Sequence, residues 1–160
     1  MSIESKTVYT IGHSRHPMDK FLQLLQPYGI QTVIDVRSKP VSRFASQFNR
    51  KRIEPELQQH GLQYLFYGDM LGGMPVDKEY RRDDDSIDYE KLAVSELFIK
   101  GLDAVEARIN AGDVMVLMCT EKHPSDCHRY SLIGAELAKR GVQVVHLLSE
   151  GGHLTQDDVR

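Results

Sequence analysis

The chain has 160 residues, 41% of them hydrophobic and 27% charged, which suits one globular domain with a single sizeable core. Its net charge of −3 excludes a general electrostatic attraction to nucleic acid, so any such binding would need a local basic patch. Two cysteines exclude a disulfide scaffold, and no apolar stretch is long enough for a membrane span or the core of a signal peptide. We therefore expect a cytoplasmic protein with no membrane partner, whose thiols are normally reduced.

Short apolar runs alternate with helical patterns in the first half of the chain. The runs at residues 8–11 and 32–36 are rich in β-branched side chains and predict two strands. A short helix that ends near Pro27 lies between them. A weaker helix over about residues 50–59 then leads to a third strand at residues 62–66.

The second half opens with a long irregular stretch over residues 67–86, and loops of this length often act as functional lids. The longest predicted helix follows at about residues 89–110, with one apolar stripe formed by Val94, Phe98, Leu102, Val105 and Ile109. Residues 114–118 form a fourth strand, and a helix from about Asp126 to Gly141 leads to a fifth strand at residues 142–148. Residues 151–160 read as a loose tail.

This alternation predicts a single α/β domain over residues 1–160, with its core in residues 7–148. We expect a Rossmann-like sheet of five parallel strands with helices on both faces. The favoured strand order is 3-2-1-4-5, and the flavodoxin-like order 2-1-3-4-5 is the alternative. The favoured order brings together the carboxyl ends of strands one, two and four, where open α/β sheets bind ligands.

Polar side chains follow the first of these strands directly. Gly12 allows a tight exit from the strand, after which His13 and Ser14 are placed to present hydrogen-bond donors to a ligand. His13 is also a candidate for proton transfer. The simpler alternative is that Ser14 or His16 caps the following helix.

The second strand is followed by a basic segment, with six cations and no acid between Asp35 and Glu54. Arg37 and Arg43, together with Ser38, are candidates for binding a phosphate, because the arginine fork suits bidentate contact with an anion. Two phenylalanines among the cations suit stacking on bases. The alternative is a solvated loop whose phenylalanines fill the core. For the run Arg50-Lys51-Arg52 we favour the solvated face.

The fourth strand is followed by a segment that contains both cysteines of the chain. Cys127 is expected in the first turn of a helix, where backbone N–H groups lower the pKa of a thiol, assisted by His128 and Arg129. Cys119 is then a nucleophile and Cys127 its resolving partner, although Cys119 also fits a small buried core residue. Glu121 is a second candidate for proton transfer.

Three further patterns bear on the predicted site. The spacing from Cys119 to Arg129 is too long for the oxyanion loop of a rhodanese or tyrosine phosphatase. A metal site would combine Cys119, His123, Cys127 and His128, but their spacing matches no standard zinc pair, so we predict no metal and name no cofactor. On the long loop, the pair Gly72 and Gly73 would let the backbone approach a ligand closely.

Taken together, these residues resemble the bacterial family known as domain of unknown function 488. The matching segments span nearly the whole chain in the expected order: residues 10–14, 35–38, 40, 42–43, 48–49, 61–64, 71–73, 118–121, 124 and 127–129. The Cys-His-Arg segment is the most specific, whereas His123 stands where the family pattern has an acidic residue. The resemblance implies a fold and a shared site at the strand ends, and it supplies no reaction.

The leading hypothesis is a small α/β enzyme acting on a phosphate-bearing nucleotide or nucleic-acid-related ligand. Arg37 and Arg43 would hold the anion, Cys119 or Cys127 would act as nucleophile, and Arg129 would stabilise developing negative charge. One alternative is a non-catalytic module whose basic segment docks on nucleic acid. Another is a thiol or metal redox protein.

Overall fold

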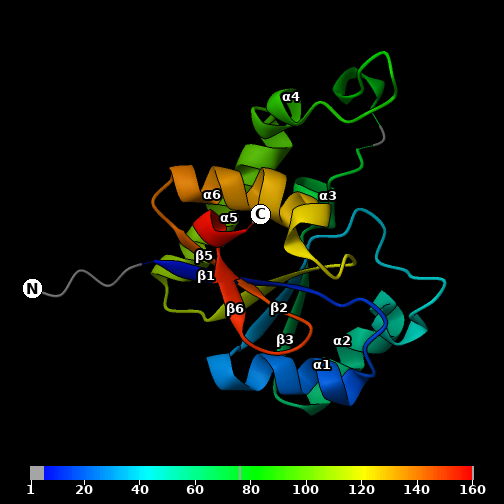
Figure 1. Ribbon diagram of the computed structural model, residues 1–160, viewed down its shortest axis with the longest axis vertical. Coiled ribbons are helices and arrows are strands. Elements are labelled where there is room, and N and C mark those ends of the chain that lie inside the picture. The colour runs from blue at the N-terminus through cyan, green and yellow to red at the C-terminus, as the bar shows by residue number, and fades with distance from the viewer. Residues whose placement is uncertain (1–5, 76, 160) are drawn as a thin grey trace, which may run out of the picture.

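The computed structural model describes residues 6–75 and 77–159, and a six-stranded sheet runs through them with helices on both faces (Figure 1). The strand order is β3-β2-β4-β1-β5-β6. The first five strands in chain order are parallel to their neighbours, and β6 is antiparallel to β5. The strands are β1 (Thr7–Gly12), β2 (Thr32–Asp35), β3 (Gln63–Phe66), β4 (Met115–Cys119), β5 (Gln143–Leu147) and β6 (His153–Thr155).

The expected α/β class and the five parallel strands are present, but the favoured strand order is wrong. β4, and not β1, pairs with β2, for example through Val33 opposite Val116. Every residue of β4 is buried, whereas β1 alternates between partly buried and buried positions at its start. A continuous apolar run suits the most central place in a parallel sheet. The carboxyl ends of β1, β2 and β4 nevertheless still lie side by side.

The C-terminal residues are ordered into the sheet, where the sequence predicts a loose tail. Thr155 pairs with Val145, and His153 pairs with Leu147. Val159 is only 6% exposed. This segment therefore covers the outer edge of β5, which would otherwise present unpaired backbone groups.

Helices cover the two faces of the sheet in unequal groups (Figure 1). One face packs against α1 (Met18–Leu25) and α2 (Arg50–Gln59). The other packs against α3 (Gly68–Leu71), α4 (Tyr89–Ala93), α5 (Glu96–Asn110) and α6 (Ala135–Lys139). Single 3-10 turns lie at Gln26–Tyr28, Ser46–Phe48, Lys78–Tyr80, Pro124–Asp126 and Gln156–Asp158. A π-helical turn at Arg129–Gly134 leads directly into α6.

The long helix expected over residues 89–110 is two helices, because Ser95 caps a second start. The Ser95 Oγ accepts a hydrogen bond from the Phe98 N–H at 3.3 Å, which satisfies a donor of the first turn of α5. Val94 lies in the break and is 72% exposed, so it does not belong to the apolar stripe. None of the helices among the described residues is both long and apolar enough to cross a membrane.

The last helix begins later than the sequence predicts. Residues 124–126 form a 3-10 turn, closed by the Cys127 N–H donating to the Pro124 carbonyl at 3.1 Å. Cys127 then has extended backbone, with φ −133° and ψ 146°. It precedes the helical region that begins at Arg129, rather than lying inside a first turn.

Candidate functional site

A cavity of about 480 Å³ opens at the carboxyl ends of β2 and β4. Its walls come from three segments: the start of the loop after β2, the segment from Cys119 to His128, and parts of the long connection between β3 and α4. The cavity thus lies at the edge of the sheet where a ligand site is predicted. Both cysteines of the chain line it.

The two cysteines face each other in this wall and are joined as a disulfide. Cys119 ends β4 and is 2% exposed, and Cys127 is 7% exposed. The composition predicts normally reduced thiols, so we expect this adjacent pair to alternate between the dithiol and the disulfide. In reducing compartments a disulfide is usually a transient, catalytic one.

The Arg129 side chain lies behind the disulfide and is fully buried. Its Nη1 donates to the Cys119 Sγ at 3.3 Å and to the Glu121 carbonyl at 3.3 Å. Burial lowers the pKa of Arg129 to about 10, against the opposing influence of Glu121 and Asp126, so the guanidinium remains charged at neutral pH. Among the described residues no carboxylate forms an ion pair with it.

A chain of hydrogen bonds fixes the other side of this guanidinium. The Arg129 Nε donates to the Thr10 Oγ1 at 3.2 Å, and the Thr10 hydroxyl lies 2.6 Å from His146 Nδ1. The other ring nitrogen of His146 lies 2.6 Å from the Gln156 Oε1, which can only accept, so it carries the proton. The Thr10 hydroxyl therefore donates to His146 and accepts from Arg129.

His128 lies next to the second cysteine, and a hydrogen bond also fixes its orientation. Its Nε2 lies 3.1 Å from the Val36 carbonyl, which can only accept, so this nitrogen carries the proton of the neutral ring. Its Nδ1 lies 3.5 Å from the Cys127 Sγ and is left with a lone pair. Burial lowers the pKa of His128 to about 4, although the Val36 and Leu71 carbonyls act to raise it. The neutral imidazole is therefore placed to accept a hydrogen bond from the thiol of a reduced Cys127.

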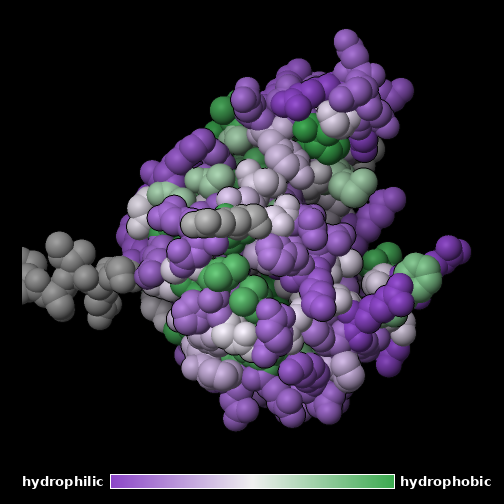
Figure 2. Space-filling view, viewed as in Figure 1, coloured by the Kyte–Doolittle hydropathy of each residue, from purple (hydrophilic) through white to green (hydrophobic). Residues whose placement is uncertain are grey.

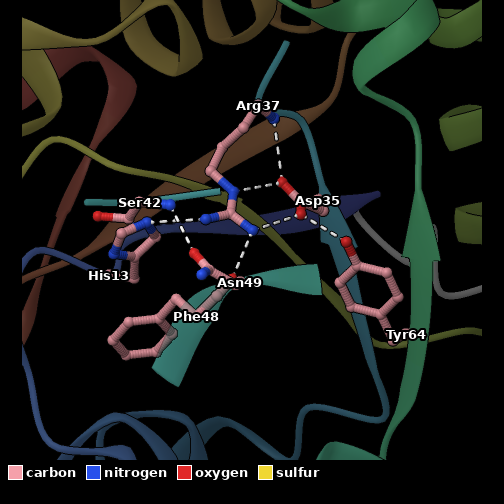
Figure 3. A network of polar contacts seen from close by, with 7 residues as sticks. All are labelled: His13, Asp35, Arg37, Ser42, Phe48, Asn49 and Tyr64. Atoms are coloured by element: carbon pink, nitrogen blue, oxygen red, sulfur yellow. Dashed lines mark hydrogen bonds and ion pairs between the residues drawn. The ribbon is translucent and has the colours of Figure 1, made fainter. Parts of the chain in front are cut away.

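A separate polar network surrounds the other buried arginine (Figure 3). Arg37 forms a two-point ion pair with Asp35, at 2.9 Å from Nε and 2.7 Å from Nη2. Its remaining contacts are the Phe48 carbonyl at 2.7 Å and His13 Nε2 at 3.1 Å. The Tyr64 hydroxyl donates to the same Asp35 at 2.5 Å. Arg37 reaches the cavity wall, but its fork is occupied by Asp35 and does not offer the bidentate phosphate contact predicted for it.

The alternation of side chains along the strands separates these two networks. In β4, Cys119 and Leu117 belong to the core on the α5 and α6 face, whereas Met118 belongs to the core on the α1 and α2 face. His13 continues the parity of Ile11, which lies on the α1 and α2 face. The sequence places His13 and Cys119 in one hollow, and the structure places them on opposite sides of the sheet.

His13 is fully buried and does not line the cavity. Its ring stacks on Phe48 with centroids 4.5 Å apart, and its Nδ1 donates to the Ser14 carbonyl at 2.7 Å. Burial lowers the pKa of His13 to about 4, partly opposed by the Ser14 carbonyl. His13 therefore helps to position Arg37, and its hydrogen bonds go to Arg37 and the Ser14 carbonyl.

The other predicted site residues divide into two groups. Ser38, Gly73 and Glu121 line the cavity, and the Ser38 Oγ accepts from the Met74 N–H at 2.9 Å. Ser14 and Arg43 do not line it. Ser14 bonds instead through its backbone N–H to the Thr120 carbonyl, and the Arg43 side chain is exposed on the loop after β2.

The two glycines of the long connection are required by close packing rather than by an unusual turn. A Cβ on Gly73 would lie 2.7 Å from the Cγ of His128, and one on Gly72 would overlap Ser38. Gly73 thus brings the connection against the imidazole that faces Cys127. Gly73 lines the cavity, whereas Gly72 packs against Ser38 beside it.

Several residues that build the site carry no functional signal in the sequence. Thr10 and His146 lie inside strands and read as core positions, and Gln156 lies in the segment that reads as a tail. Asp35 is visible as an acid at the end of an apolar strand, but its pairing with Arg37 and Tyr64 depends on the fold. Within the described ranges 6–75 and 77–159, no group of three or more His, Cys, Asp or Glu side chains is arranged to hold a metal ion.

The fold and this site define an α/β protein with a cysteine-lined cavity at the carboxyl edge of a mostly parallel sheet. The family model described as "Domain of unknown function DUF488" matches residues 17–135. The chain belongs to that family, as its strand-end motifs predict. No curated protein and no solved structure matches the chain.

Proposed function

We propose that this protein is a thiol-dependent redox enzyme in which Cys119 is the nucleophile and Cys127 the resolving cysteine. One observation carries the proposal: a fully buried guanidinium, without a carboxylate partner among the described residues, lies 3.3 Å from the Cys119 sulfur. An unpaired buried charge is costly, and a Cys119 thiolate would neutralise it. Arg129 therefore favours the reduced, ionised form of Cys119.

The proposed reaction is thiol–disulfide exchange with a small disulfide in the cavity. The Cys119 thiolate attacks one sulfur of the substrate, forming a mixed disulfide and releasing the other sulfur as a thiolate. The Cys127 thiol, oriented by its contact with His128 Nδ1, then loses its proton to a solvent base and attacks the Cys119 sulfur. This step forms the Cys119–Cys127 disulfide and releases the second half of the substrate as a thiolate. An external dithiol restores the enzyme by the reverse exchange.

The geometry favours this function over chemistry on a phosphate-bearing ligand in the same cavity. The sequence predicts that Arg37 and Arg43 bind a phosphate, but Arg37 is bonded to Asp35 and Arg43 lies outside the cavity. The charged side chains of the wall have mixed sign, with Lys39 and Arg81 against Glu121 and Asp126.

The test follows the two cysteines separately in the reduced protein. The rate of alkylation by iodoacetamide, measured by mass spectrometry against pH, should give Cys119 a pKa below the ordinary thiol value of about 8.5. Cys127→Ser should trap a mixed disulfide with hydroxyethyl disulfide, and Cys119→Ser should not. Ordinary pKa values for both thiols, or trapping by both variants alike, would contradict the proposal.

A further inference from the structure

The loop between β2 and α2 projects from the molecule and carries a concentration of positive charge. This loop, cyan in Figure 1, begins at the carboxyl end of β2, where the cavity also opens. Together with the first turn of α2 and one residue of the β1–α1 connection it forms what we term the basic loop surface. Its six cations are all exposed: Arg15, Lys39, Arg43, Arg50, Lys51 and Arg52.

The charges of this surface lack the usual counter-ions. The sequence has no acid between Asp35 and Glu54, and none of the six cations forms an ion pair with another described residue. Three of them occupy the start of α2, whose first turn contains no acid. Cations at this end oppose the helix dipole, which favours negative charge there. The arrangement reduces helix stability and suits binding of an external anion.

An aromatic ring is exposed among these cations. Phe44 is 69% exposed, and the Arg15 guanidinium lies over its ring at 4.9 Å from the centroid. Val41 beside it is 65% exposed, whereas Phe48 is fully buried in the core. Figure 2 shows hydrophobic residues flanked by hydrophilic ones on the projection at this edge. Of the two phenylalanines in the segment, one fills the core and the other is largely exposed beside a guanidinium.

The loop is held in a defined shape by its own hydrogen bonds. The Asn49 side chain accepts from the Ser42 N–H at 2.5 Å, and the Ser42 Oγ accepts from the Ala45 N–H at 3.1 Å. The Arg50 N–H donates to the Pro40 carbonyl at 2.9 Å. The exposed ring is therefore presented on an ordered loop, which lowers the entropy cost of binding.

We infer that the basic loop surface binds single-stranded nucleic acid, with phosphates on the cations and an unpaired base on Phe44. Aromatic stacking together with arginine and a positively charged track is the usual chemistry of single-strand binding. A duplex buries its base faces, so it would not engage the ring. A lipid surface would need more apolar area than Phe44 and Val41 supply. Of the six cations, Lys39 also lines the cavity of the thiol pair, but the inferred binding does not depend on the proposed redox function.

The experiment measures binding of a fluorescent oligothymidylate of about a dozen nucleotides by anisotropy, at several salt concentrations. Affinity should fall with salt with a log–log slope of about −3, which corresponds to roughly four phosphates on a single strand. Phe44→Ala should weaken binding about tenfold, from the loss of one stacked base, and Phe44→Trp should retain it. Arg43→Gln should weaken binding several-fold and reduce the slope.

The matched control is Lys100→Gln, which removes an exposed cation from α5, on the opposite face of the sheet, and should leave binding unchanged. Equal losses for Arg43→Gln and Lys100→Gln would overturn the inference, as would binding to vesicles of anionic phospholipid without binding to the oligonucleotide. The Cys119→Ser variant should bind the oligonucleotide normally. A failure of redox activity and a failure of nucleic-acid binding are thereby distinguished.

Discussion

At the residue scale, the positive charges of the two buried arginines are balanced in different ways. Arg37 is neutralised by Asp35, which also accepts a hydrogen bond from the Tyr64 hydroxyl. Arg129 has carbonyls, Thr10 and the Cys119 sulfur around it. The first arrangement holds the loop after β2 in place, and the second leaves a charge that a thiolate can satisfy. The same residue type thus has a structural role on one face of the sheet and a chemical role on the other.

Removing the charge next to Cys119 should alter its redox chemistry. In Arg129→Met the thiolate loses its positive partner, so the pKa of Cys119 should rise and the disulfide should become harder to reduce. We expect at least a tenfold shift of the dithiol–disulfide equilibrium, about 30 mV in reduction potential, measured against glutathione buffers.

Thr10→Val provides a milder variant, because it removes only the hydroxyl that accepts from the Arg129 Nε. It should shift the potential in the same direction by a smaller amount, while circular dichroism confirms that the protein remains folded. A potential unchanged in both folded variants would show that the guanidinium does not act on Cys119.

Breaking the other pair should reduce stability without this redox effect. Asp35→Asn leaves Arg37 buried and unpaired, and should lower the free energy of unfolding by about 3 to 5 kcal/mol in urea titration. Tyr64→Phe removes one hydrogen bond to Asp35 and should cost about 1 kcal/mol. Since the side-chain hydrogen bonds of Arg37 go to Asp35, Phe48 and His13 rather than to a sulfur, the reduction potential of the folded variants should match that of the parent protein.

At the element scale, the strands were predictable from apolar runs, because burial on both faces of a parallel sheet leaves a plain signal in the sequence. The order of the strands was not predictable, because two apolar strands compete for the place beside β2 and their burial in the fold decides between them. β4 lies where the sequence predicts β1. The break at Ser95 carried a capping signal inside a longer apolar stripe. β6 gives no clear signal in the sequence, because a three-residue strand at the edge of a sheet needs little hydrophobicity.

The C-terminal segment should prove necessary for both stability and the thiol site. Truncation after Ser149 removes β6, the buried Val159 and the Gln156 partner of His146. We expect a loss of about 3 kcal/mol in the free energy of unfolding, from apolar burial and an unsatisfied imidazole. Gln156→Ala separates the contributions, because it keeps the strand and removes only the hydrogen bond. If the strand provides most of the stability, this variant should lose no more than about half as much in thermal and urea denaturation.

At the scale of the whole molecule, three neutral histidines make the stability of the fold depend on pH. Burial is the main cause that lowers the pKa values of His13, His128 and His146 to about 4 each. The three rings lie on both faces of the sheet, so the dependence of stability on pH involves both hydrophobic cores. The sequence shows the histidines, but their neutrality follows only from the tertiary burial that the fold imposes.

Stability should therefore fall as the pH drops from about 6.5 toward 4. Each ring takes up a proton near pH 6.5 in the unfolded chain, but only near pH 4 in the folded one, so unfolding binds protons within this window. The contribution is fully present above pH 6.5, and at pH 5 each histidine should have cost roughly 2 kcal/mol. Urea titrations of the oxidised protein at intervals from pH 7 to pH 4.5 measure this slope without interference from thiols. His146→Gln should reduce the slope by about one proton, because it removes one of the three groups. A free energy of unfolding that stays constant between pH 7 and pH 5 would mean that these imidazoles are not held neutral by the folded core.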